Sequence, residues 1–275
     1  MKVKIALAQM ACEWDAKANL RKALSLMQKA KAKGAEIICF PELALTIFFP
    51  AYRADAKYFD WAEPIPGATA KLVAKRAKEL KLTTLLNTFE KAGHGRHHET
   101  SVAIDGEGKI LGTARAIHVA EGPYCNGKYY FWPGDGGFPV FAAGLCRIGI
   151  AAGYDRHFPE QMRMLTLNGA EIIFSPAADA ATDPLAMHRA EMQGCAFSNG
   201  VFIAVVNRAG KEENVEFGGE SFVAAPSGQI IAAARRGEEE LLLCDIDTDE
   251  IEIERRKRPF LRDRRPDIYR SLAEK

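Results

Sequence analysis

A short pattern occurs twice in this chain and constrains its fold more than any other feature. The sequence KGAEIICFP at 33–41 is echoed by NGAEIIFSP at 168–176. In each copy a glycine ends a helical segment, and an apolar run then begins a strand that stops at a proline. Two similar βαβ-like halves within one pseudo-symmetric domain explain this repetition.

Strand and helix signals alternate around these two copies. Period-two or continuous apolar runs predict strands, and apolar residues at helical spacing predict helices. The resulting α/β pattern favours helices packed outside a sheet. The predicted strands are 3–10, 35–40, 82–90, 100–112 with a turn at 106–108, 201–206, 220–226, 229–234 and 241–246, and the predicted helices are 15–33, 67–80 and 184–198.

No linker divides the chain, so residues 1–250 are predicted to form one domain. Residues 251–275 carry many arginines, with Phe260, Leu261, Ile268 and Tyr269 between them. Composition alone leaves two alternatives for this segment: a solvated, disordered tail, or an arm that packs on a neighbouring subunit. The apolar residues favour the arm.

Composition and charge exclude several classes of function. The formal net charge is +1, which gives no reason to expect binding to nucleic acid or a membrane through bulk electrostatics. No apolar stretch reaches transmembrane length, and the N-terminus lacks a signal-peptide pattern. The six cysteines are scattered without a CxxC pair, as expected for free thiols in a reducing compartment. These features predict a cytoplasmic protein.

The segment 147–160, RIGIAAGYDRHFPE, predicts a strand that turns sharply into a helix running to about residue 168. Such an elbow presents its turn residue at the top of a sheet, near backbone N–H groups and the positive end of the helix dipole. Enzymes often place a nucleophile there. In this chain the elbow residue is Gly153, which has no side chain.

Four motifs in order relate the chain to a known family: FPEL at 40–43, FWPGD at 131–135, RIG at 147–149 and DRHFPE at 155–160. With these motifs the chain resembles the nitrilase superfamily of carbon–nitrogen hydrolases. PELALT at 41–46, FFP at 48–50, GKEEN at 210–214 and APSGQI at 225–230 are most similar to the N-carbamoyl-D-amino-acid amidohydrolases. The resemblance implies a four-layer α-β-β-α sandwich with internal pseudo-two-fold symmetry, assembled as a homodimer or homotetramer, and it implies no cofactor and no metal.

The family that the chain resembles uses a cysteine nucleophile, a glutamate base, a lysine that helps hold the oxyanion, and a supporting second glutamate. By this resemblance Glu42 occupies the position of the base, whereas Ala116 replaces the lysine, Gly153 the cysteine and Gly127 the second glutamate. Covalent amide hydrolysis needs a thiolate, a proton acceptor and a cation near the oxyanion. The chain is therefore expected to lack the covalent mechanism of that family.

The remaining candidates each have two interpretations. Glu42 is either a retained base, with a pKa raised by desolvation, or a buried carboxylate with another partner. Arg156 and His157, with Tyr154 beside them, are candidate substrate-binding residues, because an arginine can pair with a carboxylate through two hydrogen bonds. Arg156 could equally be a surface residue at a helix start.

Several other side chains are expected to be structural. Cys125 lies in the long loop 120–137 and is either a displaced nucleophile or an ordinary loop thiol. The favoured alternatives are a structural, hydrogen-bonded His118, an Asp155 that orients the elbow, and a solvated loop containing His94, His97 and His98 rather than a zinc site.

These observations favour a non-catalytic homologue that binds a small amide, carbamoyl or carboxylate ligand, or associates with an active paralogue. The alternative is an active hydrolase of non-peptide C–N bonds, of the amidase or N-carbamoyl amino acid amidohydrolase type, with Glu42-dependent chemistry. A third hypothesis is a structural or interaction role of the charged arm.

Overall fold

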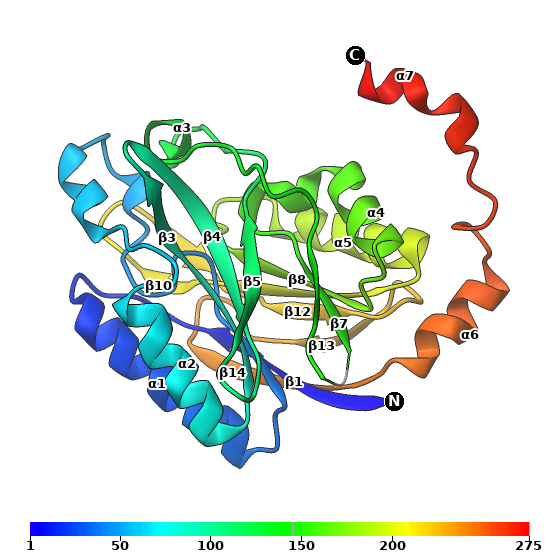
Figure 1. Cartoon of the computed structure of the whole chain (residues 1–275), viewed down its shortest axis with the longest axis horizontal. Coiled ribbons are helices and arrows are strands. Elements are labelled where there is room, and N and C mark those ends of the chain that lie inside the picture. The colour runs from blue at the N-terminus through cyan, green and yellow to red at the C-terminus, as the bar shows by residue number, and fades with distance from the viewer. Residues whose placement is uncertain (145, 275) are drawn as a thin grey trace.

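The computed structural model describes residues 1–144 and 146–274, and two six-stranded sheets dominate this part of the chain (Figure 1). The first sheet has the order β14-β1-β2-β3-β4-β5, and the second β13-β12-β9-β8-β7-β6. The first contains β1 (Lys2–Gln9), β2 (Ile37–Cys39), β3 (Thr83–Gly93), β4 (Arg96–Ile104), β5 (Ile110–Arg115) and β14 (Glu240–Asp247). The second contains β6 (Val140–Ala142), β7 (Arg147–Ile150), β8 (Ile172–Ala177), β9 (Phe202–Asn207), β12 (Phe222–Ala224) and β13 (Ile230–Ala233).

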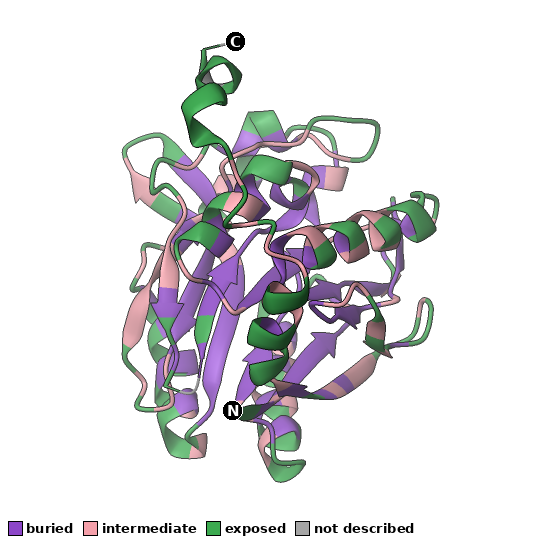
Figure 2. Ribbon diagram, turned by 90° about the vertical axis from the view of Figure 1, so that its right-hand side faces the viewer, coloured by how far each residue is buried: buried purple, intermediate pink, exposed green. Residues whose placement is uncertain are grey.

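Helices cover the outer face of each sheet, which gives the predicted four-layer α-β-β-α sandwich. Helices α1 (Ala16–Ala32) and α2 (Ala68–Leu80) lie on one side, and α4 (Pro159–Leu167) and α5 (Leu185–Asn199) on the other (Figure 1). One buried cluster joins the two sheets, with Ile5 and Phe174 among its members, and separate clusters lie between each sheet and its helices. The central strands β2, β8 and β9 are accordingly buried along their whole length, whereas edge strands such as β13 are partly exposed and the helices expose their outer sides (Figure 2).

The repeated sequence pattern occupies equivalent places in the two sheets. In the first half, Glu36 precedes β2, and its carboxylate accepts a hydrogen bond from the Lys4 amide at 3.0 Å. In the second half, Glu171 precedes β8, and its carboxylate accepts from the Arg147 amide at 2.7 Å. In both halves the next central strand is parallel to its neighbours. In each half, the glutamate of the pattern thus accepts a hydrogen bond from the main chain of the neighbouring parallel strand, as internal pseudo-two-fold symmetry requires.

The solvated loop predicted to contain His94, His97 and His98 is shorter than expected. Strand β3 continues to Gly93 and β4 begins at Arg96, so the connection is short. His97 and His98 lie in β4 and are buried, and His98 Nδ1 is 2.8 Å from the carbonyl oxygen of Trp132. Buried strand positions are usually apolar, so two consecutive histidines favour a loop when the sequence is taken alone. The described residues contain no group of three or more His, Cys, Asp or Glu placed to hold a metal ion.

Three short helices complete the chain: α3 (Gly127–Tyr130), α6 (Asp249–Lys257) and α7 (Arg270–Ala273). The predicted domain division at residue 250 falls inside α6, and Ile251 of this helix packs in the core between the sheets. After α6 the chain still contacts the sandwich, where the Phe260 ring lies 5.8 Å from that of Phe197 in α5, and it then continues as a largely exposed arm that ends in α7 (Figure 1). A small additional sheet pairs β10 (Ala209–Lys211) with β11 (Glu216–Gly218). No helix in 1–144 or 146–274 is long and apolar enough to cross a bilayer.

Candidate active site

The carboxyl ends of the parallel strands β2, β7, β8 and β9 place several candidate site residues close together. Glu42 follows β2, Gly153 follows β7, Asp179 follows β8 and Arg208 follows β9. Ligand sites of α/β proteins commonly lie beyond the carboxyl ends of such strands. A cavity of about 390 Å³ lies here, with Glu42, Gly153, Tyr154 and Arg156 among its lining residues.

Glu42 is the central acid of this cavity. Its residue is 8% exposed, and its only hydrogen bonds with described residues are made by its main chain. Burial disfavours the ionised form and, with the nearby Asp179 carboxylate, raises the pKa of Glu42 from 4.5 to about 7, although Arg156 and Arg208 act in the opposite direction. A carboxylate with such a pKa can accept and return a proton near neutral pH.

Arg208 fixes the main chain that carries Glu42. Its guanidinium donates to the carbonyl oxygens of Glu42 at 2.8 Å, of Leu43 at 2.9 Å and of Thr46 at 2.9 Å. The Glu212 carboxylate balances its charge in the same buried space. Leu43 has a positive φ of 47°, and its amide donates to the Asn87 side chain at 2.8 Å. A buried polar network therefore holds the strained turn after Glu42 in place.

The elbow forms as predicted, and its glycine faces Glu42. A 3-10 turn over Gly153–His157 links β7 to α4, and Gly153 has a φ of 48°. This left-handed conformation favours glycine over residues that carry a Cβ. A Cβ placed at position 153 would lie 2.6 Å from Oε2 of Glu42, so a side chain there would require the Glu42 carboxylate to move.

Ala116 and Gly127 line a second, smaller cavity beside Glu42. This cavity of about 20 Å³ is also bordered by Glu99, His118 and Cys125. Ala116 follows β5, and its amide donates to the carbonyl oxygen of Glu99 at 2.9 Å. A Cβ at position 127 would overlap the carbonyl oxygen of Ala120. The three positions that the resemblance equates with lysine, glutamate and cysteine thus lie around one acid, Glu42, and none has a functional side chain.

Asp155 and His118 have the structural roles that the sequence suggested. The Asp155 carboxylate accepts from the amides of Ile117 at 3.0 Å and His118 at 2.8 Å, and it lies 2.8 Å from Nδ1 of the His118 ring. That ring stacks on Phe158, with centroids 3.6 Å apart. Asp155 therefore joins the elbow to the segment that follows Ala116. Burial raises the pKa of Asp155, while these hydrogen bonds act against the rise.

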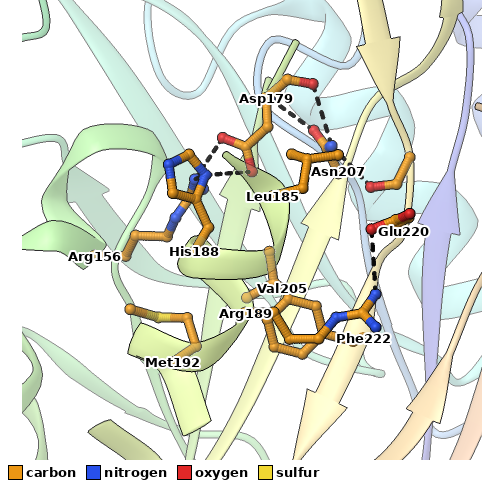
Figure 3. A pocket seen from close by; sticks show the side chains of 11 residues that line it. Arg156, Asp179, Leu185, His188, Arg189, Met192, Val205, Asn207, Glu220 and Phe222 are labelled. Carbon is orange, nitrogen blue, oxygen red and sulfur yellow. Dashed lines mark hydrogen bonds and ion pairs between the residues drawn. The ribbon is translucent and has the colours of Figure 1, made fainter. Parts of the chain in front are cut away.

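Arg156 is buried and already has an internal partner. Its guanidinium pairs with Asp179, and its Nη2 lies 3.3 Å from Nδ1 of His188 (Figure 3). Although burial opposes ionisation of Asp179, Arg156 and His188 hold the pKa of this carboxyl well below its usual range. Nε and Nη1 of Arg156 are buried without a hydrogen-bond partner among the described residues. The surface alternative for Arg156 is therefore wrong, and its pairing with a ligand carboxylate stays a prediction.

His157 and Tyr154 border the large cavity, as their place after the elbow suggests. His157 Nδ1 lies 2.7 Å from the Glu191 carboxylate, and burial, together with the charge of Arg156, lowers the pKa of His157. Tyr154 is 46% exposed. Cys125 borders both cavities, where burial and then the Glu42 carboxylate raise its pKa to about 12. A thiol with that pKa is a poor nucleophile at neutral pH, which favours the ordinary loop thiol.

Sequence reasoning missed Glu99, Asp179 and Arg208. Glu99 is 7% exposed in β4, and its carboxylate accepts from Asn87 Nδ2 at 3.0 Å. Burial and the charge of Glu42 raise the pKa of Glu99 well above its ordinary value. Asp179 and Arg208 could have been found from their positions, because each follows a buried strand of the parallel set.

Comparison with known proteins shows the family to which the chain belongs. A sequence profile described as "Carbon-nitrogen hydrolase" matches residues 4–256. The chain belongs to the carbon–nitrogen hydrolase family. Among its family relatives, an N-carbamoylputrescine amidase of Solanum lycopersicum is 37% identical, over 98% of this chain and 94% of the relative. A citrullinase of Francisella tularensis is 31% identical, over 99% of both chains.

Solved structures of the carbon–nitrogen hydrolase family share the fold. A carbon–nitrogen hydrolase from Helicobacter pylori G27 superposes with a TM-score of 0.94 at 28% identity, over 99% of both chains. A cysteine-to-alanine mutant of an amidase from Nesterenkonia sp. AN1, in complex with butyramide, superposes with a TM-score of 0.82 at 24% identity, over 98% of this chain and 96% of that one.

Proposed function

We propose that this protein hydrolyses a non-peptide C–N bond of a small amide or N-carbamoyl compound, using Glu42 to activate water. The observation that carries the proposal is the Glu42 carboxylate, buried at the wall of a cavity of about 390 Å³ with a pKa raised to about 7. Perturbed carboxylates in clefts are characteristic of acid–base sites. The family relatives named N-carbamoylputrescine amidase and citrullinase suggest the substrate class.

The chemistry differs from thiol catalysis in its first step. With glycine at position 153, no sulfur atom lies beside Glu42, and water can reach the carboxylate through the cavity of about 390 Å³ that both residues line. Ionised Glu42 takes a proton from this water, whose oxygen adds to the carbonyl carbon of the substrate. The C–N bond then breaks, and the proton held by Glu42 passes to the leaving nitrogen. Because the base must be ionised, kcat/KM is expected to rise with pH, to reach half its maximum near pH 7 and to level at higher pH.

A second candidate function is ligand binding without turnover. It is favoured by Ala116, Gly127 and Gly153, which border the two cavities and supply neither a nucleophile nor a cation for the oxyanion. The same cavity would then bind the amide or carbamoyl compound unchanged.

One experiment separates the two candidates. Ammonia release from N-carbamoylputrescine, citrulline and butyramide is measured alongside binding by calorimetry, for the unaltered protein and for Glu42→Gln. Hydrolysis is expected to disappear in Glu42→Gln, whereas binding persists because glutamine keeps the shape of the side chain. Glu216→Gln, at an exposed position in β11, serves as the matched control. Binding without ammonia release would support the second candidate, and the absence of both would refute both.

A further inference from the structure

Two carboxylates converge on the small cavity next to Glu42. Glu42 and Glu99 both border this space of about 20 Å³ and are 8% and 7% exposed. Each raises the cost of ionising the other, since the charge of Glu42 is a cause of the raised pKa of Glu99. A buried pair of like charges is stable only when a proton or a cation lies between them.

Among the described residues that border this cavity, His118 alone can carry a positive charge, and the guanidinium groups of Arg156 and Arg208 act on Glu42 from outside the cavity. That ring is engaged elsewhere, since its Nδ1 lies 2.8 Å from Asp155 and its face stacks on Phe158. Arg115, at the end of β5, pairs with Glu90 and Asp135 instead.

The hydrogen bonding of Glu42 is a second observation, separate from its charge, that points to a ligand. It is more than nine-tenths buried and borders the cavity, yet the hydrogen bonds of Glu42 with described residues are made by its main chain alone. Polar side chains buried to this extent normally have hydrogen-bond partners, so the unpartnered Glu42 carboxylate can accept donors from a molecule in either cavity that it borders. On the Glu99 side, Asn87 Nδ2 donates to Oε1 only.

We propose that the cavity between Glu42 and Glu99 is a binding site for an ammonium ion. A cavity of about 20 Å³ exceeds the roughly 10–15 Å³ that one water molecule needs, and an ammonium ion is close to water in size. Its four N–H donors can serve both carboxylates at once, and its charge allows both to be ionised. The rest of the wall includes Ala116, Gly127 and Phe131, which offer no competing cation.

This site goes beyond the proposed hydrolysis and does not depend on it. Hydrolysis of a primary amide or carbamoyl group releases ammonia, so turnover would supply the ligand next to its site. Binding can be measured without any substrate, and a failure to detect turnover leaves this inference intact.

The test is thermal unfolding of the full chain at pH 8 in NH4Cl, compared with KCl and tetramethylammonium chloride at equal ionic strength. Ammonium is expected to raise Tm in a saturable manner, by about 2–4 °C beyond the two other salts. Tetramethylammonium carries the charge without N–H donors and is too large for the cavity. An equal rise in KCl would indicate a general cation effect and overturn the inference.

Two variants assign the effect to the cavity. Glu99→Gln removes one carboxylate and is expected to abolish the ammonium-specific shift, while the control Glu216→Gln keeps it. Ala116→Lys places a tethered ammonium at the cavity wall, so it should raise Tm at pH 8 and no longer respond to NH4Cl. A response that survives in both Glu99→Gln and Ala116→Lys would refute the site.

Discussion

Replacement of Glu42 by glutamine is expected to stabilise the protein at alkaline pH and to change its stability little at acid pH. Burial and Asp179 raise the pKa of Glu42 from 4.5 to about 7, so the folded state binds a proton that the unfolded state has released between these values. Stability therefore falls as pH rises from about 4.5 to just above 7. At about 1.4 kcal/mol per pKa unit, the loss is on the order of 3 kcal/mol.

Glutamine has nearly the same shape as glutamate but carries no charge, so Glu42→Gln removes this loss. Urea unfolding followed by circular dichroism at pH 4.5, 6 and 8 measures the difference between variant and unaltered protein. The gain should be near zero at pH 4.5, intermediate at pH 6, and on the order of 3 kcal/mol at pH 8. Exposed Glu216→Gln should show no such trend. A gain that is equal at all three pH values would refute desolvation of Glu42 as the cause.

Three further perturbations test other parts of the structure. Arg208→Ala leaves the Glu212 carboxylate buried without its partner, so urea unfolding should report a loss of about 3–5 kcal/mol, and a loss below 1 kcal/mol would contradict the network. Gly153→Ala imposes a left-handed φ on alanine and should lower stability by about 1–2 kcal/mol, whereas Gly194→Ala, in open space within α5, should raise it by up to about 1 kcal/mol. Deletion of 259–275 removes the exposed arm and should yield a smaller assembly by sedimentation velocity; an unchanged assembly would exclude the arm as a subunit contact.

The α/β pattern with two similar halves could be predicted from the sequence because its signals are local, whereas the four-layer sandwich was implied by the family resemblance. The repeated pattern at 33–41 and 168–176 marks the same glycine stop, buried strand and proline in both halves, and the structure places both copies next to a central parallel strand. The convergence of Ala116, Gly127 and Gly153 on Glu42 followed from motif positions. Their steric surroundings did not, because they depend on how distant loops pack.

The second carboxylate of the site could not be predicted in this way. Glu99 lies in a strand segment that its two preceding histidines made look like a loop, and it meets Glu42 only through the packing of β4 against its neighbours. Sequence periodicity tells which face of a strand a residue occupies, but not which acids share a cavity across a sheet. Arg156 shows the same limit, since its buried partner Asp179 lies 23 residues away.

The close approach of Gly127 to the carbonyl oxygen of Ala120 makes a side chain harder to introduce at position 127 than at position 153. At position 153 the atoms nearest to a new Cβ belong to the movable carboxylate of Glu42, but at position 127 the nearest atom is a main-chain carbonyl oxygen. A lineage that carries this loop could gain a side chain at 153 in one step, against the cost of the left-handed φ of 48°. To gain one at 127, it would first need a change that moves the main chain at Ala120. The order in which substitutions can accumulate here is therefore set by loop geometry as well as by selection for chemistry.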